Sequence, residues 1–140
     1  MEIFLRASTL AELAPLEGGG FDGVIFGAEF CPFRLPKISE VEEARLICAE
    51  NGLAFTLSTP LLRQAHFNFT SKWLREALKE GEEWSANDWG LLFWAKNECF
   101  ENPVNAGRLP GKQRRYSRTV EMVRGASTEE ARAHGGSGWG

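Results

Sequence analysis

The chain has 140 residues, of which 43% are hydrophobic and 25% charged, and its formal net charge is −3. This length and composition are typical of one globular domain and exclude wholesale disorder. The mildly acidic balance argues against an obligate nucleic-acid partner. No apolar run approaches the roughly 20 residues that span a bilayer, and the first residues lack the pattern of a secretion signal, so we expect no membrane association.

The three cysteines, Cys31, Cys48 and Cys99, are odd in number and widely spaced. That pattern indicates free thiols in a reducing compartment rather than a disulfide framework. We therefore expect a cytoplasmic protein.

The first predicted elements are a strand, a short helix and a second strand. The alternating apolar pattern of residues 3–7 predicts the strand. Thr9 stands three residues before Glu12, a capping box that predicts a helix through about residue 16. The apolar run at residues 23–27 predicts a strand covered on both faces, as in parallel sheets.

A loop with two prolines leads to the next helix and strand. Ser39 and Glu42 form a second capping box, and the helix that they open ends at Asn51. Cys48 falls on the apolar stripe of that helix and is predicted to lie in the core. Residues 53–58 then predict a third strand.

The second half continues the same alternation. A loop that holds His66 precedes a predicted helix over residues 71–79, a strand over 83–87, a helix over 89–97 and a strand over 103–107. His66 has no nearby carboxylate, so we expect it to be structural or solvent-facing. The aromatic side chains of this region are predicted to pack around the fourth strand and its helix: Trp84, Trp89, Phe93 and Trp94.

Alternating strands and helices build parallel sheets, either open or rolled into a barrel. Because an eight-stranded barrel needs about 250 residues, we predict an α/β fold that is a partial TIM-like barrel of about five strands. We place this domain at residues 1–118 and a flexible C-terminal tail at residues 119–140, which we expect to be disordered because Gly, Ser, Ala and charge dominate from Gly125 onward. Five parallel strands leave an unpaired edge, so we expect a homo-oligomer or a second chain that completes the barrel.

Ligands of such folds bind beyond the carboxyl ends of the strands. The residues that end the predicted strands are Glu29, Cys31, Thr59, Asn87, Asp88, Gly107 and Arg108. Glu29 and Asp88 could form a carboxylate pair for acid–base or metal chemistry. In the alternative interpretation, Asp88 or Asn87 caps the next helix and Glu29 is solvated.

The remaining candidates also have two interpretations each. Cys31 is either a thiolate ligand of a metal or cluster or a small buried apolar side chain, and Cys99 has no partner at ligand spacing. Gly107 and Arg108 could present amides and a guanidinium to an anion. A basic cluster either binds RNA or an acidic partner, or is a solvated turn, which the acidic chain favours; its residues are Lys112, Arg114, Arg115, Tyr116 and Arg118. No nucleophile has an assigned base, so catalytic residues stay unknown.

Several segments resemble one family in order and spacing. Residues 21–34, Phe-Asp-Gly-Val-Ile-Phe-Gly-Ala-Glu-Phe-Cys-Pro-Phe-Arg, resemble the "ADAVYLG…F…R" segment of the collagenase-like peptidase family U-thirty-two. Residues 53–60 resemble its next strand, residues 87–90 its Asp-x-Gly strand end, and residues 107–113 a further motif. The resemblance covers about residues 1–118.

This resemblance implies a TIM-like barrel from a family of peptidases, RNA-hydroxylating proteins and ubiquinone-hydroxylation proteins. Several members carry a four-iron, four-sulfur cluster, and Cys31 matches a first cluster cysteine, so the resemblance implies that Cys31 is a ligand. The other cluster cysteines belong to the second half of the barrel, and Cys48 and Cys99 do not align with them. We therefore expect an N-terminal portion of an iron–sulfur or peptidase-type enzyme, active only when a partner supplies the missing cysteines. The alternative is a non-catalytic interaction module that dimerises or docks through its open sheet edge.

Overall fold

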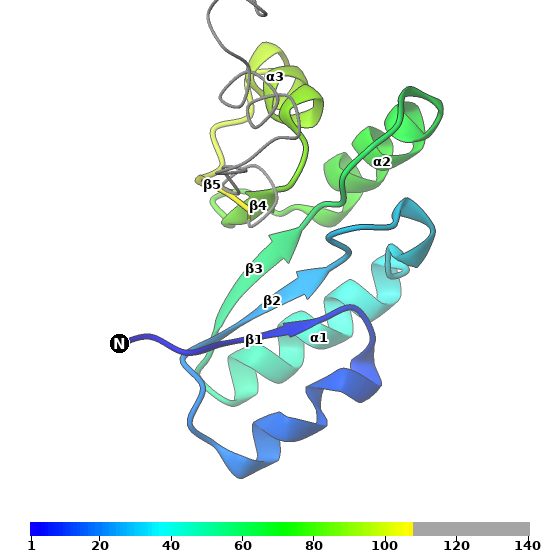
Figure 1. Cartoon of the computed structure of the whole chain (residues 1–140). Coiled ribbons are helices and arrows are strands. Elements are labelled where there is room, and N and C mark those ends of the chain that lie inside the picture. The colour runs from blue at the N-terminus through cyan, green and yellow to red at the C-terminus, as the bar shows by residue number, and fades with distance from the viewer. Residues whose placement is uncertain (108–140) are drawn as a thin grey trace, which may run out of the picture.

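The computed structural model describes residues 1–107, which form one sheet of five parallel strands in the order β1-β2-β3-β4-β5. The sheet is not closed, and β1 and β5 are its edges (Figure 1). The strands are β1 Phe4–Ala7, β2 Gly23–Gly27, β3 Ala54–Ser58, β4 Trp84–Ala86 and β5 Val104–Ala106. The predicted α/β fold of five parallel strands is confirmed. The expected tail at residues 119–140 lies outside the described residues, as does the end of the domain proposed for residues 1–118.

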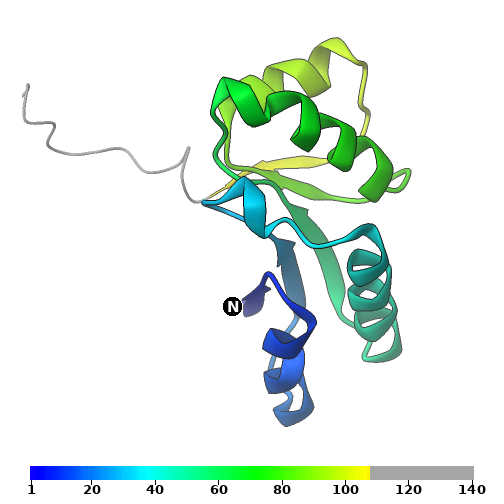
Figure 2. The ribbon, with the colours of Figure 1, turned by 90° about the vertical axis from the view of Figure 1, so that its right-hand side faces the viewer.

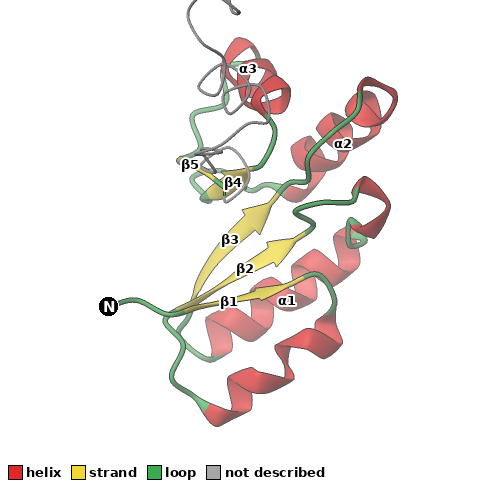
Figure 3. Ribbon diagram, viewed as in Figure 1, coloured by secondary structure: helices red, strands yellow, loops and turns green. Residues whose placement is uncertain are grey.

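Helical segments connect each strand to the next (Figure 3). Two are 3-10 helices, η1 Leu10–Gly18 and η2 Pro32–Arg34, and three are α-helices, α1 Ile38–Glu50, α2 Gln64–Ala77 and α3 Trp89–Asn97. Right-handed crossovers between neighbouring parallel strands bring each helix to the same face of the sheet. Figure 2 shows the helices along one side of the strands.

The strand register explains which side chains form the core. Val24 lies beside Leu5 and Phe55, and Phe26 lies beside Ala7 and Leu57. These positions face the helices, and Val24 and Phe26 are fully buried. The same core cluster contains Cys48 of α1, which is 1% exposed, so its predicted core position is confirmed.

The opposite face of the sheet carries two rows of mostly polar side chains. Arg6, Ile25 and Thr56 are neighbours in one row, and Ser58, Ser85 and Asn105 are neighbours in the next. We call these six residues the polar face. Glu83 links it across the strands, because its carboxylate accepts hydrogen bonds from Thr56 Oγ1 at 3.1 Å and Asn105 Nδ2 at 2.6 Å. None of the six belongs to the apolar core cluster.

Two predicted helix starts are wrong. The helix α1 begins at Ile38, and the Glu40 carboxylate accepts a hydrogen bond from the Lys37 amide at 2.7 Å, so the cap lies two residues before Ser39. Glu42, the other half of the predicted box, pairs instead with Arg45 and Lys79.

The helix α2 begins at Gln64, seven residues earlier than predicted, so His66 lies in a helix and not in a loop. The start was missed because the buried stripe of this helix contains Thr70 and Ser71 among its apolar residues. In the first helical segment, Glu12 does accept hydrogen bonds from the Ser8 and Thr9 amides, but the helix is of the 3-10 type and contains Pro15.

The packing predicted for the four aromatic residues holds for only part of the set. Trp84 is 1% exposed, and Trp94 packs edge to face on Phe67 and Phe100. Trp89 and Phe93 are 56% and 63% exposed, so the prediction is wrong for them. They stand one turn apart on the outer surface of α3, where no described element covers them.

Candidate functional site

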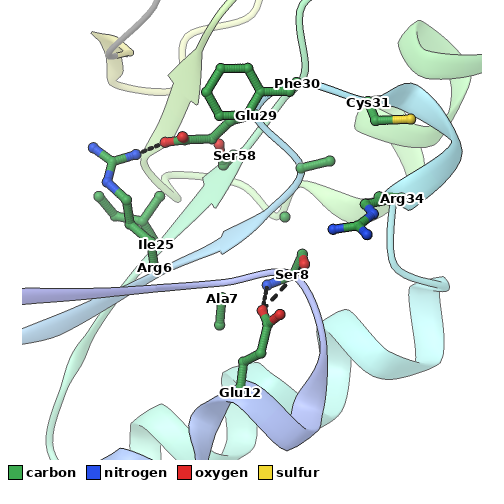
Figure 4. A pocket seen from close by; sticks show the side chains of 12 residues that line it. Arg6, Ala7, Ser8, Glu12, Ile25, Glu29, Phe30, Cys31, Arg34 and Ser58 are labelled. Atoms are coloured by element: carbon green, nitrogen blue, oxygen red, sulfur yellow. Dashed lines mark hydrogen bonds and ion pairs between the residues drawn. The ribbon is translucent and has the colours of Figure 1, made fainter.

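A cavity of about 380 Å³ opens at the carboxyl ends of β1, β2 and β3, and we call it the strand-end pocket (Figure 4). Its position follows the rule for parallel sheets, and its volume falls in the range of small-molecule sites. The sheet supplies its floor and the segments after β1 and β2 its walls. Twelve residues line it: Arg6, Ala7, Ser8, Glu12, Ile25, Gly27, Ala28, Glu29, Phe30, Cys31, Arg34 and Ser58.

An ion pair joins two strands at one side of this pocket. The Arg6 guanidinium of β1 binds the Glu29 carboxylate, which follows β2. The Glu29 side chain is 13% exposed, so the expectation of a simply solvated carboxylate is wrong. The Glu29 carbonyl also accepts a hydrogen bond from the Leu61 amide at 2.9 Å, which holds the β2 and β3 loops together.

The opposite wall carries a second acid and a second guanidinium. The Glu12 Oε2 atom accepts hydrogen bonds from the Ser8 amide at 2.6 Å, from Ser8 Oγ at 3.2 Å and from the Thr9 amide at 3.3 Å. The hydrogen bond from the Ser8 amide is the largest cause that lowers the pKa of the Glu12 carboxyl, and the charge of Arg34 lowers it further. Figure 4 shows the Arg34 side chain extending toward Ser8 across the pocket.

The floor depends on a glycine. Gly27 ends β2 with φ at 140°, and a Cβ there would lie 2.2 Å from the Ser58 carbonyl oxygen. Only glycine allows β2 and β3 to approach this closely in this conformation. The close approach of β2 and β3 at the floor of the pocket therefore depends on one residue at a strand end.

Cys31 is a half-buried lining residue of the pocket (Figure 4). The other two thiols are elsewhere, because Cys48 is buried in the core and Cys99 is exposed just after α3. Among residues 1–107, no three Cys, His, Asp or Glu side chains are grouped closely enough to hold a metal ion. A four-iron cluster is normally held by four thiolates, so the described residues alone do not fit one.

The other strand-end candidates hold the sheet together. Asn87 is 1% exposed, and its Nδ2 donates to the Thr59 carbonyl at 2.9 Å and to Ser58 Oγ at 3.3 Å. Thr59 is fully buried, and its Oγ1 donates to the Ser85 carbonyl at 3.1 Å. Neither Asn87 nor Thr59 lines the strand-end pocket.

Asp88 caps α3, because its Oδ1 accepts from the Leu91 amide at 3.0 Å and its Oδ2 from the Leu62 amide at 3.2 Å. The capping interpretation of Asp88 agrees with this geometry. Asp88 is not a lining residue of the pocket that Glu29 lines. His66 is half-buried and packs edge to face on Phe33, with ring centroids 4.9 Å apart. Arg108 and the basic cluster at residues 112–118 lie outside the described residues.

Sequence reasoning missed four charged or polar residues of the pocket: Arg6, Ser8, Glu12 and Arg34. Ser8 comes directly after β1, so the strand-end rule applied to the first strand would have found it. Arg34 follows β2 by seven residues, and no pattern in the sequence indicates that η2 turns it back toward the pocket.

Comparisons of the chain with models of protein families, with curated proteins and with solved structures found no match. Within residues 1–107, every helix is too short or too polar to cross a bilayer.

Proposed function

We propose that the chain is a barrel segment resembling the collagenase-like peptidase family U-thirty-two, and that it binds its ligand at the strand-end pocket once a second chain completes the barrel. The observation that carries this proposal is the strand order. Doubly wound sheets reverse their strand order and cover both faces with helices. Here the order is sequential, as in the (βα)-barrels.

The polar face supports the same proposal. Parallel sheets occur almost only where both faces are covered, and in a closed barrel the second face becomes the interior. Thr56, Ser58 and Ser85 are buried hydroxyl residues on that face. Hydroxyl side chains on the same face of the sheet as the Arg6 guanidinium suit a ligand-lined interior better than a dry core, because placed polar groups orient a bound ligand.

Cys31 is the one thiol among the described residues that line the pocket, so these residues alone cannot hold an iron–sulfur cluster. A cluster of the kind that the resemblance implies would need its other thiolates from the completing chain. We include a cytoplasmic location in the proposal, and the three free thiols support it.

The first experiment measures the assembly state of the full chain by size-exclusion chromatography with light scattering. We expect a homo-oligomer, or a complex when the chain is purified from its native host. A folded monomer that binds and turns over a substrate alone contradicts the proposal.

The second experiment tests Cys31 in the isolated complex by anaerobic iron–sulfur reconstitution. Cys31→Ala should abolish the absorbance of a bound cluster while the unfolding midpoint stays close to that of the unmodified protein. Cys99→Ala is the matched control, because Cys99 is exposed and distant from the pocket residues, and it should load normally. Equal loading of both variants contradicts a ligand role for Cys31.

A second candidate function is a non-catalytic interaction module that docks through the open edge. The β5 strand favours it, because all three of its residues are exposed and its outer edge has no partner strand among the described elements. Val104→Pro would remove an edge position suited to pairing. If this variant loses assembly without changing any ligand binding by the pocket, the interaction module is the better account.

A further inference from the structure

The strand-end pocket contains two sets of opposite charges, and only one set is closed. Arg6 and Glu29 bind each other directly. Glu12 and Arg34 line the same pocket, but no carboxylate of residues 1–107 forms an ion pair with the Arg34 guanidinium. We call Glu12 and Arg34 the open pair. The donors of Arg34 are therefore available to a ligand of the pocket.

The Glu12 carboxylate is held in place by groups close to it in the chain. Its Oε2 atom accepts hydrogen bonds from the Ser8 amide at 2.6 Å, from Ser8 Oγ at 3.2 Å and from the Thr9 amide at 3.3 Å. Its Oε1 atom accepts no hydrogen bond from the described residues. Because the hydrogen bond from the Ser8 amide lowers the pKa of this carboxyl, the group is charged near neutral pH. Oε1 is thus a fixed anionic acceptor.

The Arg34 guanidinium faces Glu12 from the opposite wall. The turn η2 fixes its backbone, because the Arg34 amide donates to the Cys31 carbonyl at 3.0 Å. Figure 4 shows the Arg34 side chain reaching across the pocket toward Ser8. The charge of Arg34 is near enough to lower the pKa of Glu12, although the two groups form no ion pair. A small ligand can therefore lie between them.

The surroundings of the open pair indicate what else the ligand carries. A second cavity of about 400 Å³ shares Ser8, Glu12 and Arg34 with the strand-end pocket, so both cavities give access to the open pair. The strand-end pocket also has an apolar part, which is formed by Ala7, Ile25, Ala28, Phe30 and Cys31. Ligand sites commonly combine such an apolar wall with a few placed polar groups. The apolar wall suits an apolar side chain better than a third charge.

We propose that the strand-end pocket binds an amino acid with an apolar side chain. The amino-acid carboxylate accepts hydrogen bonds from Arg34, the ammonium group donates to Glu12 Oε1, and the side chain lies against the apolar part. An amino acid carries both charges on one carbon atom, which suits two opposite charges that face one cavity without touching. A simple anion would satisfy Arg34 but would place a second negative charge beside Glu12, which is unfavourable. This inference rests on the proposed function, because it names the ligand of the same pocket.

Isothermal titration calorimetry of the full chain with L-leucine and two analogues tests the proposal. Isocaproate is leucine without the ammonium group, and isoamylamine is leucine without the carboxylate. We expect L-leucine to bind and each analogue to bind at least about tenfold more weakly, because each loses one charge-assisted hydrogen bond. No measurable binding of L-leucine, or binding of either analogue as tight as that of L-leucine, overturns the proposal.

Substitutions of the open pair should affect the three compounds differently. Arg34→Met should weaken the binding of L-leucine at least about tenfold and leave isoamylamine bound at least as tightly. Glu12→Gln should also weaken the binding of L-leucine but leave isocaproate bound at least as tightly, because a repelling carboxylate is removed. Arg63→Met and Glu17→Gln are the matched controls, because both residues are exposed and neither lines the pocket. An equal loss in the controls, or an equal loss for all three compounds in either variant, overturns the proposal.

Light scattering on the same samples separates this inference from the proposed function. An oligomer that binds no L-leucine overturns the amino-acid ligand and leaves the completed barrel standing. A monomer that binds L-leucine with the expected effects of the variants supports the amino-acid ligand and contradicts the need for a second chain.

Discussion

Asn87 is a candidate for both a structural role and a ligand-binding role, and replacing its side chain distinguishes the two. Its amide donates to the Thr59 carbonyl at 2.9 Å and to Ser58 Oγ at 3.3 Å, and the residue is 1% exposed. A Cβ on Gly107 would lie 2.2 Å from Asn87 Oδ1, so the amide also fills the space where β5 ends. Asn87→Ala therefore removes contacts among the ends of β3, β4 and β5.

The expected cost follows from these contacts. The shorter hydrogen bond contributes about 1 kcal/mol net, the longer one less, and the space left by the carboxamide adds about 1 kcal/mol. The free energy of unfolding should fall by about 2–3 kcal/mol, or roughly 7–13 °C in Tm for a domain of this size. Urea unfolding followed by tryptophan fluorescence measures the change.

The control is Asn105→Ala, which makes the same chemical change on exposed β5, where the amide donates to the Glu83 carboxylate. We expect a loss below about 1 kcal/mol. If Asn87 acts only on a ligand, Asn87→Ala should leave the midpoint unchanged. Equal midpoints for the two variants would refute the structural interpretation of Asn87.

Three further predictions concern the ion pair between Arg45 and Glu82, Gly27 at the floor of the strand-end pocket, and the Glu12 carboxylate of η1. Arg45→Met should cost about 2 kcal/mol in urea unfolding, because it removes the two hydrogen bonds at 2.7 and 2.8 Å that Arg45 donates to the 12% exposed Glu82 carboxylate. Arg75→Met breaks a pair that is about half exposed and should cost less than about 1 kcal/mol. A similar cost for both variants would contradict the argument. Gly27→Ala should cost about 3 kcal/mol or more by thermal unfolding, because the added Cβ would meet the Ser58 carbonyl. Gly52→Ala, at φ 65° in open space, should cost only about 1 kcal/mol. Equal Tm values for the two variants would contradict the close approach of β2 and β3 at Gly27. Because the folded-state pKa of Glu12 is lowered, its stabilisation is present at neutral pH and is lost as the pH falls through that pKa. Glu12→Gln should therefore lower the urea midpoint by a few tenths of a molar at about pH 7, and this difference should shrink as the pH falls below the ordinary carboxyl range. A difference that does not change with pH would contradict the assignment.

The strands could be predicted because their signal is local. Residues 23–27 and 53–58 are short apolar runs between turn residues, and the structure has β2 and β3 there. The start of α2 could not be predicted in the same way, because its buried stripe runs through Thr70 and Ser71 and its N-cap residue, Arg63, makes no side-chain cap hydrogen bond. A polar residue on the buried side of a helix interrupts the apolar periodicity of about 3.6 residues from which a helix is predicted.

Prediction of the candidate site is limited in a similar way, by contacts between residues that are far apart in the sequence. The strand-end rule found Glu29 and Cys31, which line the pocket, but it also selected Asn87 and Thr59, whose side chains turn inward. The sequence contains no sign of that difference, because it arises from the pairing of β3 with β4. The Arg6–Glu29 pair depends on β1 lying beside β2, and the two residues are 23 positions apart in the sequence.

The polar face connects the fold with the proposed need for a second chain. In β3 the sequence alternates, with Phe55 and Leu57 toward the helices and Thr56 and Ser58 on the polar face. A sheet selected to stand alone with helices on one side would gain little from a buried hydroxyl such as Thr56, whereas a barrel interior gains a ligand contact from each. Thr56→Val separates these cases: the variant should be at least as stable as the unmodified chain when the chain is tested alone, and a ligand-binding assembly should lose affinity. A large loss of stability in the isolated chain would mean that the hydrogen bond from Thr56 to Glu83 serves the fold, and the interior would lose its strongest support as a site.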